Sequence, residues 1–309
     1  MNMADQENIR QGGLRGKLMR EESMRRHVSW RAGGSVDRAY LPADLDDLRQ
    51  FLAGLPQDEP LMFVGLGSNL LVRDGGLRGT VIFTHNALKR FLLEEHAGMA
   101  EIYAEAGVAS PKVSRFAAVH DLEGGEFLSG IPGTIGGALA MNAGCYGAET
   151  WDVVARVRTI DRAGRVQIRE PHEFAIGYRH VLPLSAPDEY FVAAWFRFRK
   201  GDGEGARKTI KDLLARRIAS QPLAEPNAGS VFRNPPGNFA AKLIESCGLK
   251  GKRIGGAEVS TKHANFIVTG ANATARDIEE LIGLVRDTVK QETGIQLEQE
   301  VRIVGEAAA

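Results

Sequence analysis

Short apolar segments alternate with polar and glycine-rich ones along the first part of the chain. Arg38–Leu41, Leu61–Val64 and Thr80–Phe83 are each short and mainly apolar, which is typical of strands. From Leu45 to Leu55 the apolar residues instead recur with helical spacing. The pattern predicts a small unit of strand, helix, strand, glycine loop and strand. Residues 1–26 are charged, and we expect a helix or a loose arm there.

The middle of the chain is richer in strand patterns. Ser110 and Pro111 suit the start of a helix that we expect to run to about His120, with Ser110 as its N-cap. Asp161–Gly164 is a turn signal between two apolar segments and predicts a hairpin. The strands expected in this region are Ala100–Glu105, Val153–Ile160, Arg165–Arg169 and Tyr190–Arg199.

The C-terminal third alternates helix and strand patterns. Gly203–Gly205 is expected to be a linker that precedes it. Apolar residues along Thr274–Thr293 form one stripe at helical spacing, and Gly294 is suited to end that helix. Further helices are expected at Ala206–Ser220 and Phe239–Cys247, and strands near Glu258, at Asn265–Val268 and at Ile295–Val304. The chain is therefore predicted to be an α+β protein, and its 309 residues suggest more than one structural unit.

The composition limits the kinds of binding partner and the cellular compartment that we expect. Lys plus Arg and Asp plus Glu both number 39, and no long basic run is present, so nucleic acid and an anionic membrane are not expected partners. Cys145 and Cys247 lie in no metal-ligand or redox spacing; we expect small buried apolar residues in a reducing compartment, and no metal site. The charged segment Met1–Arg25 has no apolar core, so no signal peptide is expected. Phe127–Ala148 is uncharged, but Pro132 and six glycines make it a poor membrane helix.

Two glycine-rich segments look suited to a phosphorylated ligand. Val64–Asn69 follows a predicted strand, yet it lacks the third glycine of a dinucleotide fingerprint and the Gly-Lys-Ser/Thr of a P-loop, so alone it can equally be a tight turn. Ser129–Gly137 combines glycines with hydroxyls and leads into Ala138–Met141, so a helix N-terminus is expected to face a pyrophosphate. Together the segments suggest an enzyme that binds a nucleotide cofactor through backbone N–H groups.

A third segment, Pro226–Pro235, holds one hydroxyl in a confined turn. Ser230 follows Gly229 and lies near Arg233, and a proline stiffens each end of the segment. Two other interpretations of Ser230 stand beside a chemical one. It can be a turn serine that bonds its own backbone. It can also be a hydrolase nucleophile, although the segment lacks the Gly-x-Ser-x-Gly elbow and no His–Asp pair is indicated.

These three segments and Asn142–Gly147 occur in a fixed order, and together they closely resemble the UDP-N-acetylenolpyruvoylglucosamine reductase family. The resemblance extends from Trp30–Gly34 to Glu300–Gly305, which is nearly the whole chain. The ordered combination is more specific than any single motif. The chain is similar to the short subgroup of the family, which lacks an extra tyrosine-bearing substrate loop.

The resemblance implies a fold and a reaction. The fold is α+β: a two-lobed FAD-binding domain of the vanillyl-alcohol-oxidase/PCMH type at residues 1–85 and 86–202, then a C-terminal α+β substrate domain at 203–309 whose last strand can return to the first lobe. The family uses FAD, with NADPH as reductant, to reduce the enolpyruvyl ether of UDP-N-acetylglucosamine enolpyruvate to UDP-N-acetylmuramate. This step of peptidoglycan precursor synthesis implies a cytoplasmic enzyme with a UDP-sugar substrate, and we expect a monomer.

The resemblance also implies three catalytic residues. Arg179 would stabilise an enolate and carboxylate, Ser230 would donate the proton, and Glu300 would polarise the enolpyruvyl group or assist the enol. The residues alone allow other interpretations. Arg179 can be a surface arginine after a short helix, and Glu300 can be a solvated edge-strand charge paired with Arg302. Glu298, two residues earlier on the same predicted strand face, is the rival to Glu300.

Further residues are expected to bind the ligands. Those matched to the substrate are Tyr178, Arg233, Asn234 and, more weakly, His263. Those matched to the cofactor are Gly65, Leu66, Gly67, Ser68, Asn69, Leu70, Ser129, Ile131, Pro132, Gly133, Thr134, Gly136, Gly137 and Asn142.

Two other functions are kept as alternatives. An FAD-dependent oxidase of a small alcohol or sugar would share the fold, although no histidine motif for flavin attachment is evident. A non-catalytic flavin- or nucleotide-binding regulator would bind FAD while Ser230, Arg179 and Glu300 were dispensable.

Overall fold

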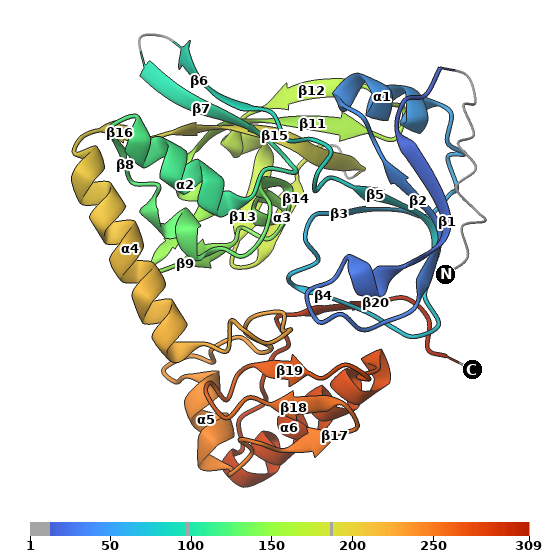
Figure 1. The fold of residues 1–309 in the computed structure, drawn as a ribbon, viewed down its shortest axis with the longest axis vertical. Helices are drawn as coiled ribbons and strands as arrows, with labels where there is room; N and C mark the ends of the chain where they lie inside the picture. The colour runs from blue at the N-terminus through green and yellow to red at the C-terminus, as the bar shows by residue number, and fades with distance from the viewer. Residues whose placement is uncertain (1–12, 97–98, 186–187, 309) are drawn as a thin grey trace. The chain divides into compact units, whose positions relative to one another are not determined.

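The computed structural model describes residues 13–96, 99–185 and 188–308, and it divides the chain into two compact units (Figure 1). The chain passes between the units several times. Of the described residues, the first unit comprises those within 13–20, 38–66 and 79–215, and the second comprises those within 21–37, 67–78 and 216–308. The expected three-part division, at residues 1–85, 86–202 and 203–309, stays a prediction.

The first part of the chain forms a four-stranded sheet with the order β1-β2-β5-β3. Its strands are β1 (Lys17–Ser23), β2 (Ser35–Leu41), β3 (Leu61–Val64) and β5 (Leu77–Phe83), and β3 is parallel to β5. Helix α1 (Leu45–Ala53) begins where the Asp44 side chain accepts a hydrogen bond from the backbone N–H of Asp47. Its apolar face, with Leu48 and Leu52 fully buried, packs in a core that includes Ile82 of β5.

An antiparallel sheet with the order β12-β11-β15-β7-β6 dominates the rest of the first unit. Its strands are β6 (Phe91–His96), β7 (Met99–Glu105), β11 (Val154–Asp161), β12 (Val166–Arg169) and β15 (Glu189–Arg197). Helices α2 (Ser110–Val119) and α3 (Ile135–Ala140) share a buried apolar core with this sheet. The smaller elements are β8 (Leu122–Glu123), η2 (Glu126–Gly130), β9 (Gly144–Cys145), β10 (Ala148–Glu149), η3 (Thr150–Val153), η4 (Pro171–Glu173), β13 (Phe174–Gly177), β14 (His180–Pro183) and β16 (Arg199–Lys200).

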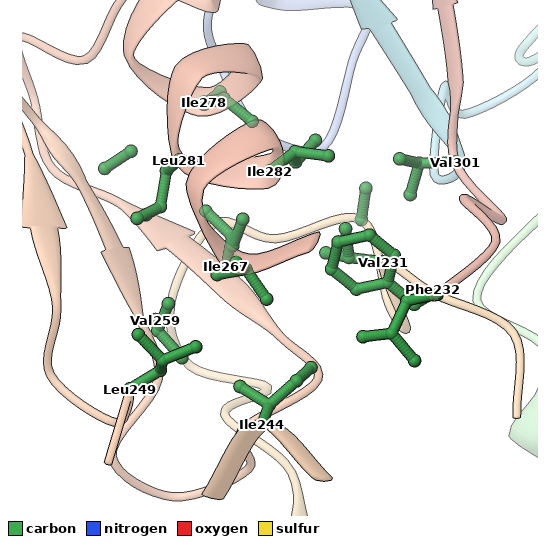
Figure 2. Close-up of a cluster of buried hydrophobic side chains, with 14 of the residues drawn as sticks. Val231, Phe232, Ile244, Leu249, Val259, Ile267, Ile278, Leu281, Ile282 and Val301 are labelled. Carbon is green, nitrogen blue, oxygen red and sulfur yellow. The ribbon is translucent and has the colours of Figure 1, made fainter. Parts of the chain in front are cut away.

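The second unit is built around one long helix, α6 (Ala275–Thr293). Its apolar stripe packs against the strands β18 and β19 and against Val231 and Phe232, as Figure 2 shows. Burying one such side chain contributes about 1.5–3 kcal/mol, so the stripe stabilises this helix more than its intrinsic propensity does. The other elements of the unit are η1 (Met24–Arg26), β4 (Leu70–Val72), α5 (Ala240–Ser246), β17 (Arg253–Ile254), β18 (Ala257–Val259), β19 (Ile267–Thr269) and β20 (Arg302–Val304), which is parallel to β4.

The strongly periodic elements match the sequence predictions, but four local predictions are wrong. Ser110 is not the N-cap of α2: Ala109 already has the extended backbone of a cap, and Ser110 lies one residue inside the helix. Gly203–Gly205 is not a linker, because α4 (Gly203–Ser220) begins there, with Asp202 accepting a hydrogen bond from the Glu204 N–H. Gly203 is buried there, within close reach of the Ala118 carbonyl.

The other two errors concern the ends of the chain. Residues 17–26 form β1 and the single turn η1 rather than a helix or a loose arm, whereas 1–12 lie outside the described residues. The expected strand Ile295–Val304 is regular only at β20, because the preceding residues pair irregularly with another segment through the bridge between Phe232 and Gln299. Cys145 and Cys247 are each half-buried against an apolar core rather than fully buried. Among the described residues, no helix is long and apolar enough to cross a membrane.

Candidate active site

The two glycine-rich segments meet in the first unit at Gly65 and Thr134. Gly65 directly follows β3, and Thr134 is the last residue before α3. A Cβ atom on Gly65 would clash with the Thr134 Oγ1 atom, so only glycine permits this approach. The Thr134 hydroxyl is buried, and it has no hydrogen-bond partner among the described residues. A narrow backbone cradle with an unpaired hydroxyl fits residues that hold a cofactor.

The start of α3 does not offer the free amides that the sequence suggested. The Ile135 N–H donates to the Val108 carbonyl at 2.8 Å, and the Gly136 N–H donates to the Ala106 carbonyl at 2.9 Å. These two amides are therefore not available to a pyrophosphate, and the prediction of a phosphate-binding helix N-terminus is wrong for them. The Ser129 hydroxyl is also engaged, since it donates to the Glu126 carbonyl at 2.6 Å.

Asn142 is buried and uses its side chain inside the first unit. Its Nδ2 atom lies 2.7 Å from Glu149 Oε2 and 3.3 Å from the Gly177 carbonyl, and its Oδ1 atom accepts from the Trp151 N–H. The contact with Gly177 is at the end of β13, directly before Tyr178. Asn142 thus supports the hairpin that carries Tyr178 and Arg179.

Arg179 lies in the two-residue turn between β13 and β14, not after a short helix as one interpretation of the sequence had it. Its φ angle is +54°, which is uncommon for a residue with a side chain. The guanidinium lies over the Tyr178 ring at 5.2 Å from the centroid, and the Tyr178 side chain is about half exposed. The turn therefore presents two neighbouring side chains suited to an anionic ligand.

Ser230 lies in an ordered turn of the second unit. The Asn227 side chain accepts a hydrogen bond from the Gly229 N–H at 3.0 Å, and the Thr269 N–H donates to the Pro226 carbonyl. Ser230 is half-buried, and within the described chain its hydroxyl makes no hydrogen bond. Ser230 is therefore not a turn serine whose hydroxyl bonds its own backbone, which was one interpretation of the sequence.

Glu300 is tied to the Ser230 turn by main-chain hydrogen bonds. The Glu300 N–H donates to the Val231 carbonyl at 2.8 Å, and Asn69 Nδ2 donates to the Glu300 carbonyl at 3.2 Å. Glu300 is half-buried, whereas the side chain of Glu298 is 75% exposed and lies 3.6 Å from Arg233. The burial difference favours Glu300 over its rival. Asn69, expected to bind cofactor, here donates a hydrogen bond to the segment that carries Glu300.

Two more residues expected to contact substrate lie in the second unit. Asn234 is exposed, and its Oδ1 atom accepts from the Ala240 N–H at the start of α5. His263 packs edge-on against the Phe266 ring, and its Nδ1 atom is buried without a partner in the described part of the chain. Burial lowers the pKa of His263 below its ordinary value of 6.5, which favours the neutral imidazole.

Two residues with defined roles were missed in the sequence. The Asn265 amide bonds both backbone groups of Phe232, at 3.0 and 2.8 Å. The Asp74 carboxylate accepts from the N–H groups of Ala275 and Arg276 at the start of α6. One indication of Asn265 was present in the sequence, because it is a single amide inside an apolar run. There was none for Asp74, which lies about 200 residues from its hydrogen-bond partners.

Comparison with known proteins defines the class of this one. Residues 36–168 match the model of the FAD binding domain, and residues 221–304 match that of the UDP-N-acetylenolpyruvoylglucosamine reductase C-terminal domain. The chain is thus a FAD-containing oxidoreductase. A UDP-N-acetylenolpyruvoylglucosamine reductase of Thiobacillus denitrificans is 57% identical over 303 residues, which cover 95% of this chain and 94% of the relative. The chain belongs to the UDP-N-acetylenolpyruvoylglucosamine reductase family.

Further comparisons agree with this assignment. The enzyme of the same name from Methylococcus capsulatus is 57% identical over 296 residues, covering 96% of this chain and 95% of the relative. The crystal structure of UDP-N-acetylenolpyruvylglucosamine reductase from Thermus caldophilus has a TM-score of 0.76 at 29% identity, covering 94% and 98% of the two chains. The expected α+β fold, with a FAD-binding domain and a C-terminal domain, is confirmed, and so is FAD with NADPH as reductant, whereas the vanillyl-alcohol-oxidase/PCMH type of the FAD-binding domain stays a prediction. The flavin oxidase alternative is not favoured.

Proposed function

We propose that this enzyme reduces UDP-N-acetylglucosamine enolpyruvate to UDP-N-acetylmuramate through the residues Ser230, Arg179 and Glu300. The observation that carries the assignment of roles is the Ser230 hydroxyl, which is free of hydrogen bonds within the described chain and is tied to Glu300 through the Val231 peptide. When bound, FAD accepts hydride from NADPH and supplies it to the terminal carbon of the enolpyruvyl group. The residues of the protein must then stabilise the negative charge that develops on the substrate and supply the proton.

Ser230 donates the proton to the carbon next to the carboxylate. A free hydroxyl is a weak acid, but an enolate carbon is basic enough to accept its proton. A hydroxyl already bonded to its own backbone would have to break that bond before it could turn toward the acceptor. The unengaged hydroxyl of Ser230 is ready for this transfer.

Arg179 and Glu300 are proposed to stabilise the negative charge that develops on the enolpyruvyl group. The Arg179 guanidinium can bind a carboxylate and enolate oxygen in a bidentate way, which stabilises the charge that grows as hydride arrives. Glu300 polarises the enolpyruvyl group or, when protonated, assists the enol. Tyr178, Arg233, Asn234 and His263 are the residues that we propose as substrate contacts.

The cofactor is held by the cradle around Gly65 and Thr134. The close approach of Gly65 to an unpaired buried hydroxyl supports this assignment. We extend the proposal to the other residues of the two glycine segments and to Leu70 and Asn142, with Asn69 and Asn142 also supporting the segments that carry Glu300 and Arg179.

The wider setting is also a proposal. Equal numbers of acidic and basic residues, 39 each, support an enzyme that binds neither nucleic acid nor a membrane, and we propose a monomer. A role in peptidoglycan precursor synthesis supports a cytoplasmic location. A ping-pong cycle follows from the chemistry, because NADPH and the UDP-sugar act in separate steps. Intersecting double-reciprocal plots would contradict that order.

The role of Ser230 is tested by Ser230→Ala in the two half-reactions. Reduction of the flavin by NADPH is expected to stay within about twofold of wild type, because that step uses no proton from Ser230. Reoxidation of the reduced flavin by the UDP-sugar is expected to slow by at least about 10²-fold, as when a general acid is lost. Anaerobic stopped-flow absorbance measures both rates.

Ser246→Ala is the matched control for this experiment. The Ser246 hydroxyl donates to the Leu243 carbonyl at the end of α5, so it has a structural partner. This variant is expected to retain both half-reactions. Equal slowing of reduction and reoxidation in Ser230→Ala would rule out the proposed role.

A further inference from the structure

Asn265 is a buried polar side chain that the proposed mechanism does not use. It is only 4% exposed. Its Oδ1 atom accepts a hydrogen bond from the Phe232 N–H at 3.0 Å, and its Nδ2 atom donates to the Phe232 carbonyl at 2.8 Å. One amide group thus holds both backbone groups of a residue two positions after Ser230, in the way that a neighbouring strand would.

The backbone on both sides of Phe232 is held as well. On the edge that faces Asn265, the Val231 N–H donates to the Asn265 carbonyl at 2.9 Å. On the other edge, the Val231 carbonyl accepts from the Glu300 N–H, and the Arg233 N–H donates to the Glu298 carbonyl, each at 2.8 Å. The segment that follows Ser230 therefore lies between Asn265 and the irregular segment that carries Glu300.

Apolar packing alone does not set this arrangement. Val231 and Phe232 are both about 1% exposed and lie in the core drawn in Figure 2. Such packing is not directional, so it permits small shifts of the backbone along the segment. The main-chain hydrogen bonds can form with many side chains at position 265. The Asn265 amide adds a directional side-chain contribution to the register of this segment, through its two hydrogen bonds to Phe232.

We propose that Asn265 is a positioning residue that fixes the position of the Ser230 hydroxyl relative to Glu300. It does so through its two hydrogen bonds to the backbone of Phe232, which we call the Asn265 clasp. This inference rests on the proposed function, since it assigns a reason for the placement of the proposed proton donor. The Asn265 amide oxygen and one of its N–H groups are engaged by Phe232, so Asn265 acts through the turn rather than by contact with the substrate.

The first test is Asn265→Asp. At pH 8 the introduced carboxylate still accepts from the Phe232 N–H, but it repels the Phe232 carbonyl instead of donating to it. Reoxidation by UDP-N-acetylglucosamine enolpyruvate is expected to slow by about tenfold to a hundredfold, as small misplacements of reacting groups do. Reduction by NADPH is expected to stay within about twofold of wild type.

Acid should restore the clasp in the same variant. A protonated carboxyl offers one donor and one acceptor, as the asparagine amide does. The ratio of wild-type to variant reoxidation rates is therefore expected to fall by at least about threefold between pH 8 and pH 5.5. The charged and titratable groups on the neighbouring segments are Arg233, Glu298, Glu300 and His263, and the wild-type enzyme, which has the same groups, is measured over the same pH range as the control.

A double-mutant cycle separates positioning from a general loss of structure. If Asn265 acts by placing the Ser230 hydroxyl, then Asn265→Asp added to Ser230→Ala should slow reoxidation by less than about twofold further. Thr274→Ala is the control, because it removes a helix cap in the same unit and touches neither segment. Asn265→Gln, which keeps the amide but displaces it by one methylene, is the second variant if Asn265→Asp does not fold.

The outcomes are distinct. Multiplying losses in the double variant, or equal slowing of reduction and reoxidation, would overturn the positioning role and leave the proposed function intact. A wild-type enzyme whose reduced flavin ignores the UDP-sugar would overturn both. Selective slowing that acid relieves, and that is absent in the Ser230→Ala background, supports the clasp.

Discussion

At the scale of single residues, Arg179 combines an unfavourable backbone conformation with the proposed role. Its φ of +54° lies in the left-handed region, which costs a residue with a Cβ atom about 1–2 kcal/mol relative to glycine. If stability alone determined the sequence of this turn, glycine would be expected at position 179. The strain is explained if the guanidinium is needed at the tip of the β13–β14 hairpin.

Arg179→Gly is expected to separate stability from activity. Glycine relieves the backbone strain, so the free energy of unfolding should equal or exceed that of wild type. Reoxidation by the UDP-sugar should fall by about 10²–10³-fold, as when one donor to a developing oxyanion is removed. Urea unfolding and stopped-flow absorbance measure the two effects.

Arg179→Ala is the matched comparison, since it loses the guanidinium but keeps the strain. It should be about 1 kcal/mol less stable than Arg179→Gly. Equal stability of the two variants, or retention of turnover in Arg179→Gly, would contradict the explanation.

His263 should make stability fall in mild acid. Burial lowers its pKa below 6.5, so the folded protein favours the neutral ring while the unfolded chain binds a proton near pH 6.5. This contribution to stability is complete above pH 6.5 and is lost as the pH falls through the lowered pKa. In His263→Phe, the decrease in urea midpoint between pH 7.5 and pH 5.5 should therefore be smaller than in wild type.

An exposed histidine is the control for this effect. The His172 side chain is 76% exposed, so His172→Gln is the comparison variant that removes a histidine from the surface instead of from the interior. A pH dependence that is identical in His263→Phe and wild type would show that the buried ring does not contribute.

At this scale, the types and the order of residues in the sequence identified candidate functional residues, but they did not predict the contacts around those residues. The Pro226–Pro235 motif predicted Ser230 as a special hydroxyl, and the structure adds that this hydroxyl is unengaged within the described chain. Neither the φ of Arg179 nor the clasp by Asn265 could be predicted, because both depend on contacts between distant segments. The roles of the site residues stay predictions.

At the scale of elements, the N-terminus of α6 is capped twice. The Thr274 hydroxyl accepts from the Asp277 N–H, as the sequence around the helix start permits. The Asp74 carboxylate also accepts from the Ala275 and Arg276 N–H groups, at 3.0 and 2.9 Å. Helix α6 is therefore fixed to the segment that follows β4.

Asp74→Ala should destabilise the second unit. The two amides lose their acceptor, and the positive end of the helix dipole loses a carboxylate. The expected cost is about 1–2 kcal/mol in the free energy of unfolding, measured by urea denaturation. Asp287→Ala on the same helix is the control: its side chain is 71% exposed, and a change within about 0.5 kcal/mol is expected.

Periodicity explains which elements the sequence could predict. The stripe on Thr274–Thr293 and the hairpin at Asp161–Gly164 are local patterns, and both are present in the structure. Gly203–Gly205 and Ile295–Val304 were misjudged for opposite reasons. Gly203 is explained by close packing instead of by a flexible linker, because a Cβ atom there would clash with the Ala118 carbonyl. The alternating segment is mostly irregular because it pairs with the Ser230 turn.

At the scale of the whole molecule, the chain contributes to each unit from several separate segments. The Gly65–Asn69 loop passes from the first unit to the second between Leu66 and Gly67. Within the first unit Gly65 meets Thr134, and within the second Asn69 holds Glu300. One short loop therefore contributes Gly65 to the proposed cofactor cradle and Asn69 to the segment that carries Glu300, a proposed catalytic residue.

The most direct test of the account follows flavin absorbance in anaerobic stopped-flow. The purified enzyme is reduced with NADPH and then mixed with UDP-N-acetylglucosamine enolpyruvate. We expect rapid, sugar-dependent return of the oxidised flavin band. Reduced flavin that ignores the sugar and reoxidises only when air is admitted would contradict the proposed reaction.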